Sequence, residues 1–309
     1  MSEEIYDVLI VGGGPAGLTA GLYTSRAKLK TLLVERMILG GQVMTTTRVE
    51  NYPGFPGGID GPDLMLKFQE HCQEFGLEVR TGEMQGLVDR GEVKAAQIDG
   101  EEVLARTVII TTGAEPAKLQ VPGEDQFVGR GVSYCATCDG AFFRNATIAI
   151  VGGGDTAAEE ALFLTRFAEK VYLIHRRDQL RATKILQERV FACDKIEPLW
   201  NSTVEEVIGD NSGLKSIRLK DRQNGAIRSL ELEGLFIAIG VIPKAHFLAD
   251  ILDLDTNGYI LTDDECRTSM PGVFAAGDVR KKILKQIATA VGDGAVAAIM
   301  AEKYLLDQE

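Results

Sequence analysis

The sequence predicts an α/β protein made of two Rossmann-like domains, with the second domain inserted into the first. The same glycine-rich signature occurs at residues 12–17 and again at 152–157. Each copy follows a short apolar run typical of a buried strand, 8–11 or 148–151, and each precedes a helical pattern. A chain of 309 residues is long enough for two domains. The repeated order of strand, glycine turn and helix therefore indicates two dinucleotide-binding units.

The glycines of each signature have distinct physical roles. The first permits a tight turn, the second lets the backbone approach a pyrophosphate, and the third lets the helix pack on the strand. The phosphates then bind N–H groups at the start of the helix. The first signature contains Gly12, Gly14, Pro15, Ala16 and Gly17. The second contains Gly152, Gly154, Asp155, Thr156 and Ala157. Alanine in the third glycine position is a variant that the fingerprint allows.

The residue that follows the second strand of each unit distinguishes the two ligands. In the first unit this residue is Glu35, whose carboxylate suits the ribose diol of NAD or of the adenosine half of FAD. In the second unit the equivalent residue is His175, followed by Arg176 and Arg177. Cations at this place suit the 2′-phosphate of NADP, although a solvated basic turn is the alternative. Arg181 lies four positions beyond Arg177, so a helix would place both on one face.

Two of the five cysteines, Cys135 and Cys138, form a C-x-x-C pair ahead of the second signature. This spacing favours a redox dithiol. A zinc site is the alternative, but it needs two further ligands, and the chain has no second C-x-x-C pair. We therefore predict no metal site. Cys72 lies in an amphipathic helical pattern and is expected in the core, whereas Cys193 and Cys266 have no evident partner.

Charge and composition disfavour several classes of partner and location. The net charge of −12 at pH 7 argues against binding to nucleic acid or to an anionic membrane. The chain has no apolar run of about 18 residues, so no membrane-spanning helix is expected. The acidic N-terminus has no basic n-region, which argues against a signal peptide. These features predict a cytoplasmic protein.

The remaining elements are expected in a definite order. A loop rich in Gly and Pro at 40–57 precedes a helix at 63–76 and strand-like segments around 77–110. Near the C-terminus, residues 269–278 predict a strand followed by a tight glycine and an acid. Residues 283–304 predict a closing helix.

Two matching strand ends mark the exits from the inserted domain. Each is a strand followed by a glycine, with a proline three residues further on. We therefore expect hinges near 114–120 and 241–246. The predicted domains are a first domain in two parts, 1–116 and 245–309, and an inserted domain at 117–244.

In its two glycine signatures, its C-x-x-C pair and the motifs around them, the chain resembles the low-molecular-weight thioredoxin reductases. The resemblance covers nearly the whole chain. It rests on residues 12–17, 50–54, 135–140, 152–157, 175–182 and 277–278. It implies Rossmann-like domains of the three-layer ββα type, with FAD in the first domain and NADPH and the dithiol in the inserted one. It also implies a homodimer, an NADPH–thioredoxin reductase activity, and thioredoxin or a thioredoxin-like protein as the partner.

The resemblance assigns further residues to FAD. Glu35 would bind the adenosine ribose, and Asp278 would bind the ribityl and pyrophosphate region. The other implied FAD residues are Gly41, Gln42, Asn51, Gly113 and Gln286. Ordinary turn chemistry is the alternative role of Asn51 and Gln42. The chain departs from the family at Lys285, where an arginine is usual, and a lysine lacks the planar fork of arginine.

The resemblance also implies roles around the dithiol. Cys138 would receive electrons from the flavin, and Cys135 would attack the disulfide of thioredoxin. Asp139 is the expected general acid, although it could instead form a turn with Gly140. The thioredoxin-facing candidates are Phe142, Phe143 and Arg130, with a buried strand-entry pair as the alternative for the two phenylalanines.

A geometric conflict predicts a domain rotation. The nicotinamide and the disulfide belong to one domain, so both cannot lie against the flavin at once, and rotation about the hinges would present each in turn. Three other kinds of protein are the alternatives. Relatives that use ferredoxin lack the second glycine motif, and peroxiredoxin-linked relatives carry an extra N-terminal segment. A nucleotide-binding sensor with a regulatory disulfide would require neither a 2′-phosphate site nor hinges.

Overall fold

The structure is a computed structural model that describes residues 4–46, 49 and 51–308. The chain divides into two compact units. Unit 1 comprises Met1–Glu115 and Ile242–Glu309, and unit 2 comprises Pro116–Val241. The predicted insertion of one Rossmann-like domain into another is therefore confirmed.

Unit 1 is built on a sheet with the strand order β3-β2-β1-β6-β5-β4, and β17 pairs with β6. Its strands are β1 (Ile5–Val11), β2 (Thr31–Glu35), β3 (Glu78–Thr81), β4 (Met84–Asp89), β5 (Lys94–Ile98), β6 (Glu101–Ile110) and β17 (Val273–Ala275). The strands β1, β2, β3, β6 and β17 are parallel, whereas β4 and β5 continue from β6 as an antiparallel meander. The central parallel strands β1, β2 and β17 and the second half of β6 are nearly continuous apolar runs, as expected for a sheet covered on both faces, whereas β3 is a polar and largely exposed edge strand.

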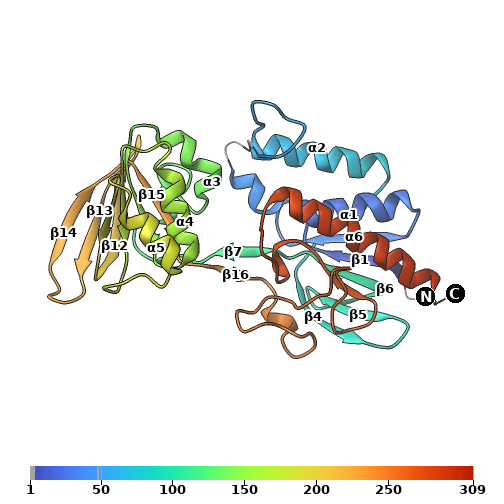
Figure 1. The fold of residues 1–309 in the computed structure, drawn as a ribbon. Coiled ribbons are helices and arrows are strands. Elements are labelled where there is room, and N and C mark those ends of the chain that lie inside the picture. The colour runs from blue at the N-terminus through green and yellow to red at the C-terminus, as the bar shows by residue number, and fades with distance from the viewer. Residues whose placement is uncertain (1–3, 47–48, 50, 309) are drawn as a thin grey trace. The chain divides into compact units, whose positions relative to one another are not determined.

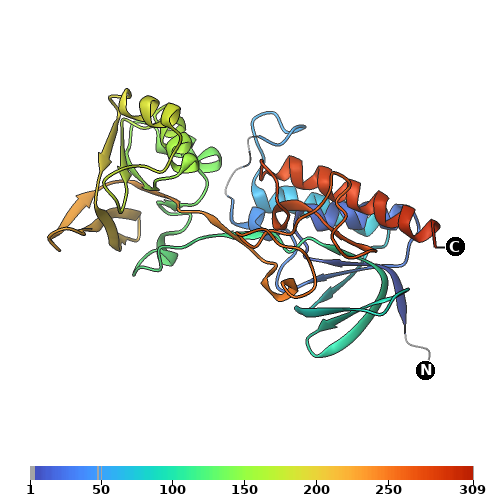
Figure 2. The ribbon, with the colours of Figure 1, turned by 60° about the horizontal axis from the view of Figure 1, so that its bottom comes forward.

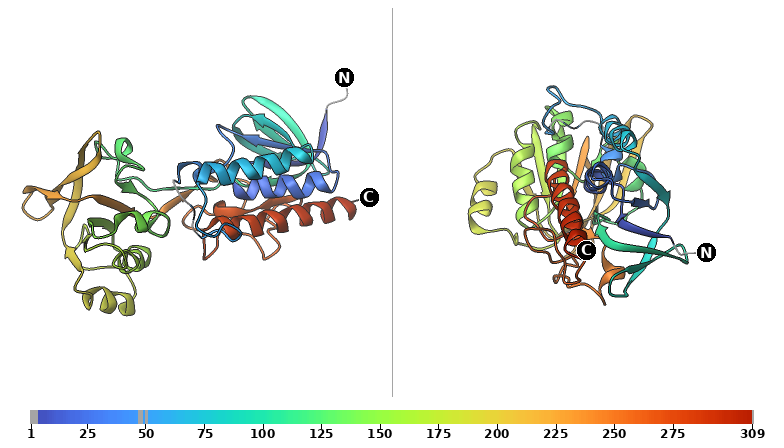
Figure 3. Two further views of the ribbon diagram at one scale, coloured as in Figure 1. Left: turned by 90° about the horizontal axis from the view of Figure 1, so that it is seen from above. Right: turned by 90° about the vertical axis from the view of Figure 1, so that its right-hand side faces the viewer.

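Three helices pack on one face of this sheet, namely α1 (Pro15–Arg26), α2 (Gly61–Glu74) and α6 (Ile287–Leu306). Figures 1 and 3 show them side by side, and Figure 2 shows the meander of β4 and β5 in teal, away from the helices. Alternate residues of β1 point to opposite faces. Val8 and Ile10 therefore join the core beneath the helices, while Leu9 and Val11 join a second core on the other face.

The closing helix begins later than the sequence predicts. Residues from 283 were expected to be helical, but α6 starts at Ile287. The reason is a capping box: Gln286 is the N-cap, and its backbone N–H donates to Thr289 Oγ1 at 3.2 Å. The predicted helix at 63–76 is present as α2 and begins two residues earlier, at Gly61.

Unit 2 also has a parallel sheet with helices on one face, but a separate antiparallel sheet packs on its other face. Its parallel sheet has the order β11-β10-β9-β15-β8, and a separate antiparallel sheet has the order β12-β13-β14. The strands are β8 (Val132–Ser133), β9 (Thr147–Gly152), β10 (Lys170–Ile174), β11 (Ile196–Leu199), β12 (Ser202–Asp210), β13 (Gly213–Asp221), β14 (Ile227–Glu231) and β15 (Gly234–Ala238). The helices are α3 (Ala136–Asp139), α4 (Asp155–Leu164) and α5 (Lys184–Phe191). In β9, Ile148 and Ile150 face the helices, and Ala149 and Val151 face the antiparallel sheet.

Two short strands connect the units. They are β7 (Ala114–Pro116) and β16 (Val241–Pro243), and they pair as a two-stranded sheet (Figure 1). Each follows a glycine in a left-handed conformation, Gly113 with φ of 75° and Gly240 with φ of 118°. The short 3-10 helices are η1 (Gly41–Thr45), η2 (Asp125–Phe127), η3 (Gly140–Phe143), η4 (His246–Leu248) and η5 (Gly277–Val279). Within the described part of the chain, no helix has the length and apolar character needed to cross a membrane.

Candidate functional site: two glycine cradles and a dithiol

The glycine loop of unit 1 combines crowded positions with one open position. A Cβ on Gly12 would overlap the backbone oxygen of Thr111, and a Cβ on Gly17 would overlap the backbone oxygen of Gly12. Gly14 differs, because no described atom lies within 4 Å of the place a Cβ would take. Gly14 is also the N-cap of α1, followed by Pro15 at the first helical position. The loop therefore leaves open space beside the free backbone N–H groups at the N-terminus of α1, which is what the binding of a pyrophosphate requires.

Glu35 lies beneath this loop at the end of β2. Its carboxylate accepts the Gly13 N–H at 2.7 Å and the Met37 N–H at 3.0 Å. These two bonds fix the carboxylate beside the loop, as a ribose acceptor requires. The segment that opens η1 also reaches the loop, because the Gly40 N–H donates to Gly13 O at 2.7 Å. Gly41, with φ of 59°, approaches Gly14 so closely that a Cβ would lie 3.2 Å from the Gly14 Cα.

Asp278 follows Gly277, a glycine with φ of 78°, at the end of β17. The Oδ1 atom of Asp278 is buried and has no hydrogen-bond partner among the described residues, although Lys282 Nζ lies 3.5 Å away. Burial raises the pKa of Asp278, and the positive charge of Lys282 opposes that effect. A buried acceptor without a donor is costly, so this atom fits a ligand that carries hydroxyl groups.

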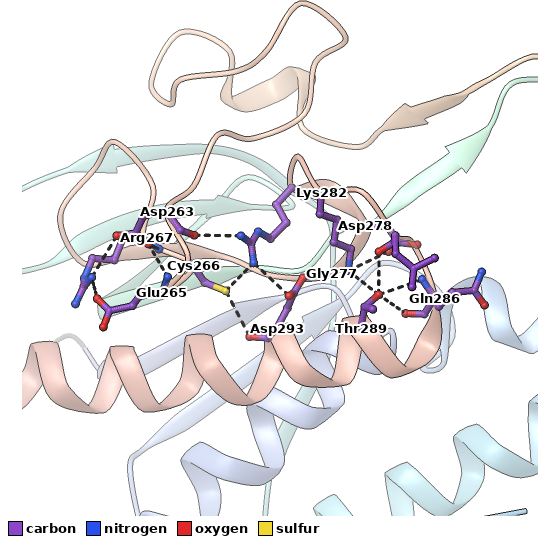
Figure 4. A network of polar contacts seen from close by, with 12 residues as sticks. Asp263, Glu265, Cys266, Arg267, Gly277, Asp278, Lys282, Gln286, Thr289 and Asp293 are labelled. Atoms are coloured by element: carbon purple, nitrogen blue, oxygen red, sulfur yellow. Dashed lines mark hydrogen bonds and ion pairs between the residues drawn. The ribbon is translucent and has the colours of Figure 1, made fainter. Parts of the chain in front are cut away.

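Asp278 belongs to a network of polar contacts that includes Lys282, Asp293 and Arg280 (Figure 4). Lys282 Nζ contacts Asp293 Oδ2 at 3.0 Å, and the same oxygen accepts the Gly277 N–H at 3.0 Å. Arg280 completes the network through Asp293 Oδ1 at 3.2 Å and Cys266 Sγ at 3.1 Å. Lys282 thus lies between two carboxylates, closer to Asp293, and offsets part of their negative charge. None of these partners of Asp278 was evident from the sequence.

Of the other predicted flavin residues of unit 1, Asn51 and Gln286 contact each other. Asn51 Nδ2 donates to Gln286 Oε1 at 2.9 Å, which joins the Gly- and Pro-rich loop to the start of α6. Gln42 is exposed on η1. Lys285 lies over the ring of Tyr259, with Nζ 4.2 Å from the ring centroid. Glu50, which belongs to the motif at 50–54, lies outside the described residues.

The glycine loop of unit 2 has the same division of roles. A Cβ on Gly152 would overlap the Ala157 Cβ and the Ala238 backbone oxygen, whereas the Cβ position of Gly154 is open to at least 4 Å from any described atom. Asp155 begins α4, and its Oδ1 accepts the Thr183 N–H at 2.6 Å. This bond ties the segment after β10 to the glycine loop. Thr156 is exposed at the same end of α4.

His175 occupies the place that Glu35 has in unit 1. Its ring lies against Gly153, where a Cβ would overlap it, and the residue is 5% exposed. Burial lowers the pKa of His175, and the charges of Arg181, Arg176 and Arg177 lower it further. The neutral ring therefore supports the loop from below. The three arginines are exposed, and none makes an ion pair within the described part of the chain.

The expectation that Arg177 and Arg181 share a helix face is wrong. Residues 175–183 are not helical, and α5 begins at Lys184. The segment instead folds back on the glycine loop, because the N–H groups of Arg181 and Ala182 both donate to Gly153 O, at 2.6 and 3.1 Å. This backbone contact brings Arg181 beside the open end of α4 without a helix.

Cys135 and Cys138 form a disulfide at the start of α3. Cys135 is the N-cap, and its Sγ accepts the Cys138 N–H at 3.2 Å. The Thr137 hydroxyl lies 3.4 Å from the same sulfur. Both contacts stabilise negative charge on Cys135, which favours this residue as a thiolate after reduction.

Asp139 is coupled to the dithiol through Ser133, which the sequence analysis did not single out. The Ser133 hydroxyl donates to Asp139 Oδ2 at 2.7 Å, and Ser133 Oγ also accepts the Cys135 N–H at 3.1 Å. Burial raises the pKa of Asp139, and the bond from Ser133 lowers it. Asp139 is both the last residue of α3 and the N-cap of η3, which begins at Gly140.

The surroundings of the dithiol include an anchor that sequence patterns did not reveal. Glu124 is 2% exposed, and its Oε1 accepts the Tyr134 hydroxyl at 2.8 Å, which holds the segment leading to Cys135. The two phenylalanines differ from each other: Phe142 is exposed, whereas Phe143 packs edge-on against Phe236 in the core. Only Phe142 is therefore placed to contact a partner. Arg130 lies over the ring of Phe127 at 5.5 Å.

The three remaining cysteines are not disulfide-bonded. Cys72 is in the core, as predicted, and burial raises the pKa of its thiol to about 12. Cys266 is also buried, and burial raises the pKa of its thiol to about 11. Cys193 is half-buried against the core of unit 2. The buried thiols of Cys72 and Cys266, which burial keeps protonated, are poor nucleophiles.

The comparisons with known proteins agree with this arrangement. The pattern of the pyridine nucleotide-disulphide oxidoreductase family matches residues 6–294. A thioredoxin reductase from Listeria innocua is 50% identical over 303 residues, which cover 98% of this chain and 95% of that protein. A thioredoxin reductase structure from Streptococcus pyogenes has a TM-score of 0.92 at 46% identity, covering 99% of this chain and 100% of that one. A Lactococcus lactis thioredoxin reductase in the FR conformation has a TM-score of 0.70 at 47% identity, covering 98% and 99%.

The two open glycine positions give a matched pair of variants. Gly14→Ala adds a methyl group in open space, so the protein should fold but lose most of its FAD, because the methyl group displaces the pyrophosphate. Gly154→Ala should keep FAD and raise the KM for NADPH at least about tenfold, a cost of about 1.4 kcal/mol. Visible flavin absorbance and steady-state kinetics measure the two effects.

Gly17→Ala serves as the contrasting variant, since its Cβ would overlap the Gly12 backbone oxygen. It should lower the melting temperature of the protein itself. Equal FAD retention in Gly14→Ala and the unaltered protein would show that the open space at Gly14 is not the pyrophosphate site.

Proposed function

Because the chain belongs to the pyridine nucleotide-disulphide oxidoreductase family, and to its thioredoxin reductases, we propose how its own residues carry electrons from NADPH to thioredoxin. It is an NADPH-dependent flavoenzyme that reduces the disulfide of thioredoxin. The observation that carries the residue assignment is the Cys135–Cys138 disulfide, which lies in the same unit as the second glycine loop and its arginines. A dithiol beside a nucleotide loop is what a disulfide reductase requires.

Unit 1 is the proposed FAD domain. The open position at Gly14 would receive the pyrophosphate, and Glu35 would accept hydrogen bonds from the adenosine ribose. The buried Asp278 Oδ1 would accept a hydroxyl of the ribityl chain. The paired Asn51 and Gln286 lie in the same unit and would line the flavin. Gly41, Gln42 and Gly113 are proposed for the same site on the family pattern.

Unit 2 is the proposed NADPH domain. The open position at Gly154 would receive the pyrophosphate, and Asp155 and Thr156 stand at the adjoining end of α4. Arg176, Arg177 and Arg181 would bind the 2′-phosphate. Their guanidinium groups are exposed, and the peptide of Arg181 is bonded to the glycine loop itself. His175 would act indirectly, by supporting Gly153 with a neutral ring.

When bound, FAD accepts a hydride from NADPH and supplies two electrons to the disulfide. The protein's part is to manage protons and charge on sulfur. Reduction breaks the S–S bond, and with one proton it leaves Cys138 as a thiol and Cys135 as a thiolate held by the Cys138 N–H and Thr137. Cys135 then attacks thioredoxin, and Cys138 resolves the mixed disulfide. Asp139, oriented by Ser133, would donate a proton to the departing thiolate of thioredoxin.

The same dithiol must be reduced at the flavin and then offered to another protein, so we infer that unit 2 rotates on the connecting strands. Gly113 and Gly240, each with positive φ, precede β7 and β16 and can absorb changes in backbone angle. Two solved relatives support this inference. They are almost equally identical to the chain, yet their whole-chain TM-scores are 0.92 and 0.70. Differences in sequence alone do not account for such a spread.

The homodimer and the cytoplasmic location stay predictions. An apolar groove of about 280 Å³ in unit 1, between α1 and α2, offers a surface for a dimer contact. It is lined in part by Leu22, Tyr52, Phe55 and Phe68. The net charge of −12 is consistent with a thioredoxin-like protein as the partner in place of nucleic acid.

Replacement of the attacking sulfur tests the electron path. Cys135→Ser should leave flavin reduction by NADPH intact but abolish thioredoxin turnover, because a hydroxyl is a far weaker nucleophile than a thiolate. Stopped-flow flavin bleaching and a coupled insulin-reduction assay measure the two steps. Cys193→Ser is the control and should turn over normally. Thioredoxin turnover by Cys135→Ser would overturn the assignment.

Removal of two arginines tests the nucleotide preference. The double variant Arg176→Ala with Arg177→Ala should lower kcat/KM for NADPH by about 100-fold, since each charged hydrogen bond contributes about 1.5 kcal/mol or more. The value for NADH should change little, because NADH has no 2′-phosphate. Arg189→Ala, on the exposed side of α5, is the matched control. Equal losses for both nucleotides would indicate damage to the loop and not loss of phosphate recognition.

A reversible cross-link tests the rotation. A disulfide engineered between unit 1 and unit 2 should stop steady-state turnover, and its reduction should restore turnover. One half-reaction should survive in the locked form, because a single orientation still serves one of the two partners. Undiminished turnover of thioredoxin by the locked enzyme would refute the rotation.

A further inference from the structure

Asp293 is a nearly buried carboxylate on α6 to which the proposed function gives no role. Its side chain is 17% exposed. Its Oδ2 atom accepts hydrogen bonds from the Gly277 N–H and from Lys282 Nζ, both at 3.0 Å. Its Oδ1 atom accepts a hydrogen bond from Arg280 at 3.2 Å. Asp293 therefore binds residues on both sides of Asp278, the proposed flavin contact (Figure 4).

The ammonium group of Lys282 lies between Asp293 and Asp278, but its contacts with the two acids are unequal. Lys282 Nζ is 3.0 Å from Asp293 Oδ2 and 3.2 Å from Thr289 Oγ1, and both contacts are hydrogen bonds. It is 3.5 Å from Asp278 Oδ1, which has no hydrogen-bond partner among the described residues. Both acceptors of Lys282 belong to α6. The helix thus holds the ammonium group away from the free oxygen of Asp278.

An ammonium group bonded to Asp278 would compete with the flavin. Lys282 is 11% exposed, so its charge needs an anionic partner within the protein. If Asp293 lost its charge, Asp278 would be left as that partner. A charge-assisted hydrogen bond from Lys282 would then occupy Asp278 Oδ1, the same acceptor that a ribityl hydroxyl requires.

Asp293 also fixes the backbone that leads to Asp278. Gly277 has a φ of 78°, and its N–H is held by Asp293 Oδ2. The position of Asp293 is itself set by close packing, because a Cβ on its neighbour Gly294 would overlap the backbone oxygen of Ala16. Ala16 lies in the first turn of α1, directly after the glycine loop. One residue of α6 therefore relates the turn before Asp278 to the proposed pyrophosphate site.

We propose that Asp293 is a positioning residue for the FAD site, which holds Lys282 away from Asp278 so that Asp278 Oδ1 stays free to accept a hydroxyl of the cofactor. This inference rests on the proposed function, in which Asp278 contacts FAD. Asp293 does not touch the cofactor in this proposal and acts through Lys282 and Gly277. Lys282 is accordingly a competitor of FAD for Asp278, which Asp293 restrains.

The test measures how tightly the holoenzyme holds FAD, and not its activity. The holoenzyme is diluted, and the rise in flavin fluorescence gives the rate at which FAD is released. In Asp293→Asn the amide oxygen can still accept the Gly277 N–H, but the charge that binds Lys282 is lost. Release of FAD should become at least about tenfold faster, because the ammonium group then occupies an acceptor that the cofactor needs.

A second substitution separates competition from general damage to the site. Lys282→Met keeps an unbranched chain of similar length but carries no charge. In the double variant Asp293→Asn with Lys282→Met no ammonium group competes for Asp278, so release should return to within about threefold of the unaltered rate. All rates are measured at alkaline pH, because burial raises the pKa of Asp278 and removal of the Lys282 charge would raise it further. A purely structural role of Asp293 predicts no such recovery.

A milder variant and a control complete the comparison. Thr289→Val removes the other hydrogen bond of Lys282 and should speed release by a smaller factor, which Lys282→Met should again reverse. Asp264→Asn removes an exposed acid of the same unit and should leave the rate unchanged. A variant that loses its FAD during purification is compared by titration with added FAD.

The outcomes distinguish this proposal from its premise. An unaltered rate of release in Asp293→Asn, or no recovery in the double variant, would overturn the role of Asp293. Asp278→Asn tests the premise and should also release FAD faster. Unchanged release from Asp278→Asn would refute the proposed contact of Asp278 with FAD, and this proposal with it. Faster release from Asp278→Asn beside normal release from Asp293→Asn would refute the role of Asp293 alone.

Discussion

Both nucleotide sites depend on one constraint, the close approach of a glycine turn to the strand beside it. In unit 1 the backbone of Gly12 lies directly against Thr111, and Gly17 lies against Gly12, so neither position has room for a side chain. In unit 2, Gly152 lies against Ala238 in the same way. This contact sets where each helix begins. The same contact leaves the open space at Gly14 and at Gly154, and it brings Glu35 or His175, the residue after the second strand, next to the loop.

The two units place different chemistry on this shared backbone. In unit 1 the residue under the loop is an acid, and Glu35 both accepts the Gly13 N–H and stays available at the loop edge. In unit 2 the ring of His175 fills that place, and burial keeps it neutral. The positive charge of this segment lies on the next two residues, Arg176 and Arg177, whose side chains are exposed. One fold thus places a carboxylate beside the loop in one unit and exposed cations in the other, as the proposed ribose and 2′-phosphate contacts require.

Local sequence signals were sufficient where a single segment determines the structure. The glycine turns, the parallel strands and the C-x-x-C pair are all of this kind, and the fold class followed from them. Prediction failed where segments far apart in the chain meet. The backbone N–H of Arg181 donates to Gly153 O and does not enter a helix, and Ser133 reaches Asp139 and the Cys135 N–H through its position on β8. No periodicity or spacing in the sequence encodes such contacts.

The polar contacts described here do not cross from one unit to the other, which is compatible with the proposed rotation. The side chains bonded to one another around the dithiol, those of Ser133, Thr137 and Asp139, all belong to unit 2. The network behind Asp278 belongs wholly to unit 1. The proposed rotation would therefore leave the hydrogen bonds of each site in place. It would deform the pairing of β7 with β16, and an isolated two-stranded ladder is only marginally stable. The two connections between the units are thus made of regular structure that costs little free energy to deform, as the proposed rotation requires.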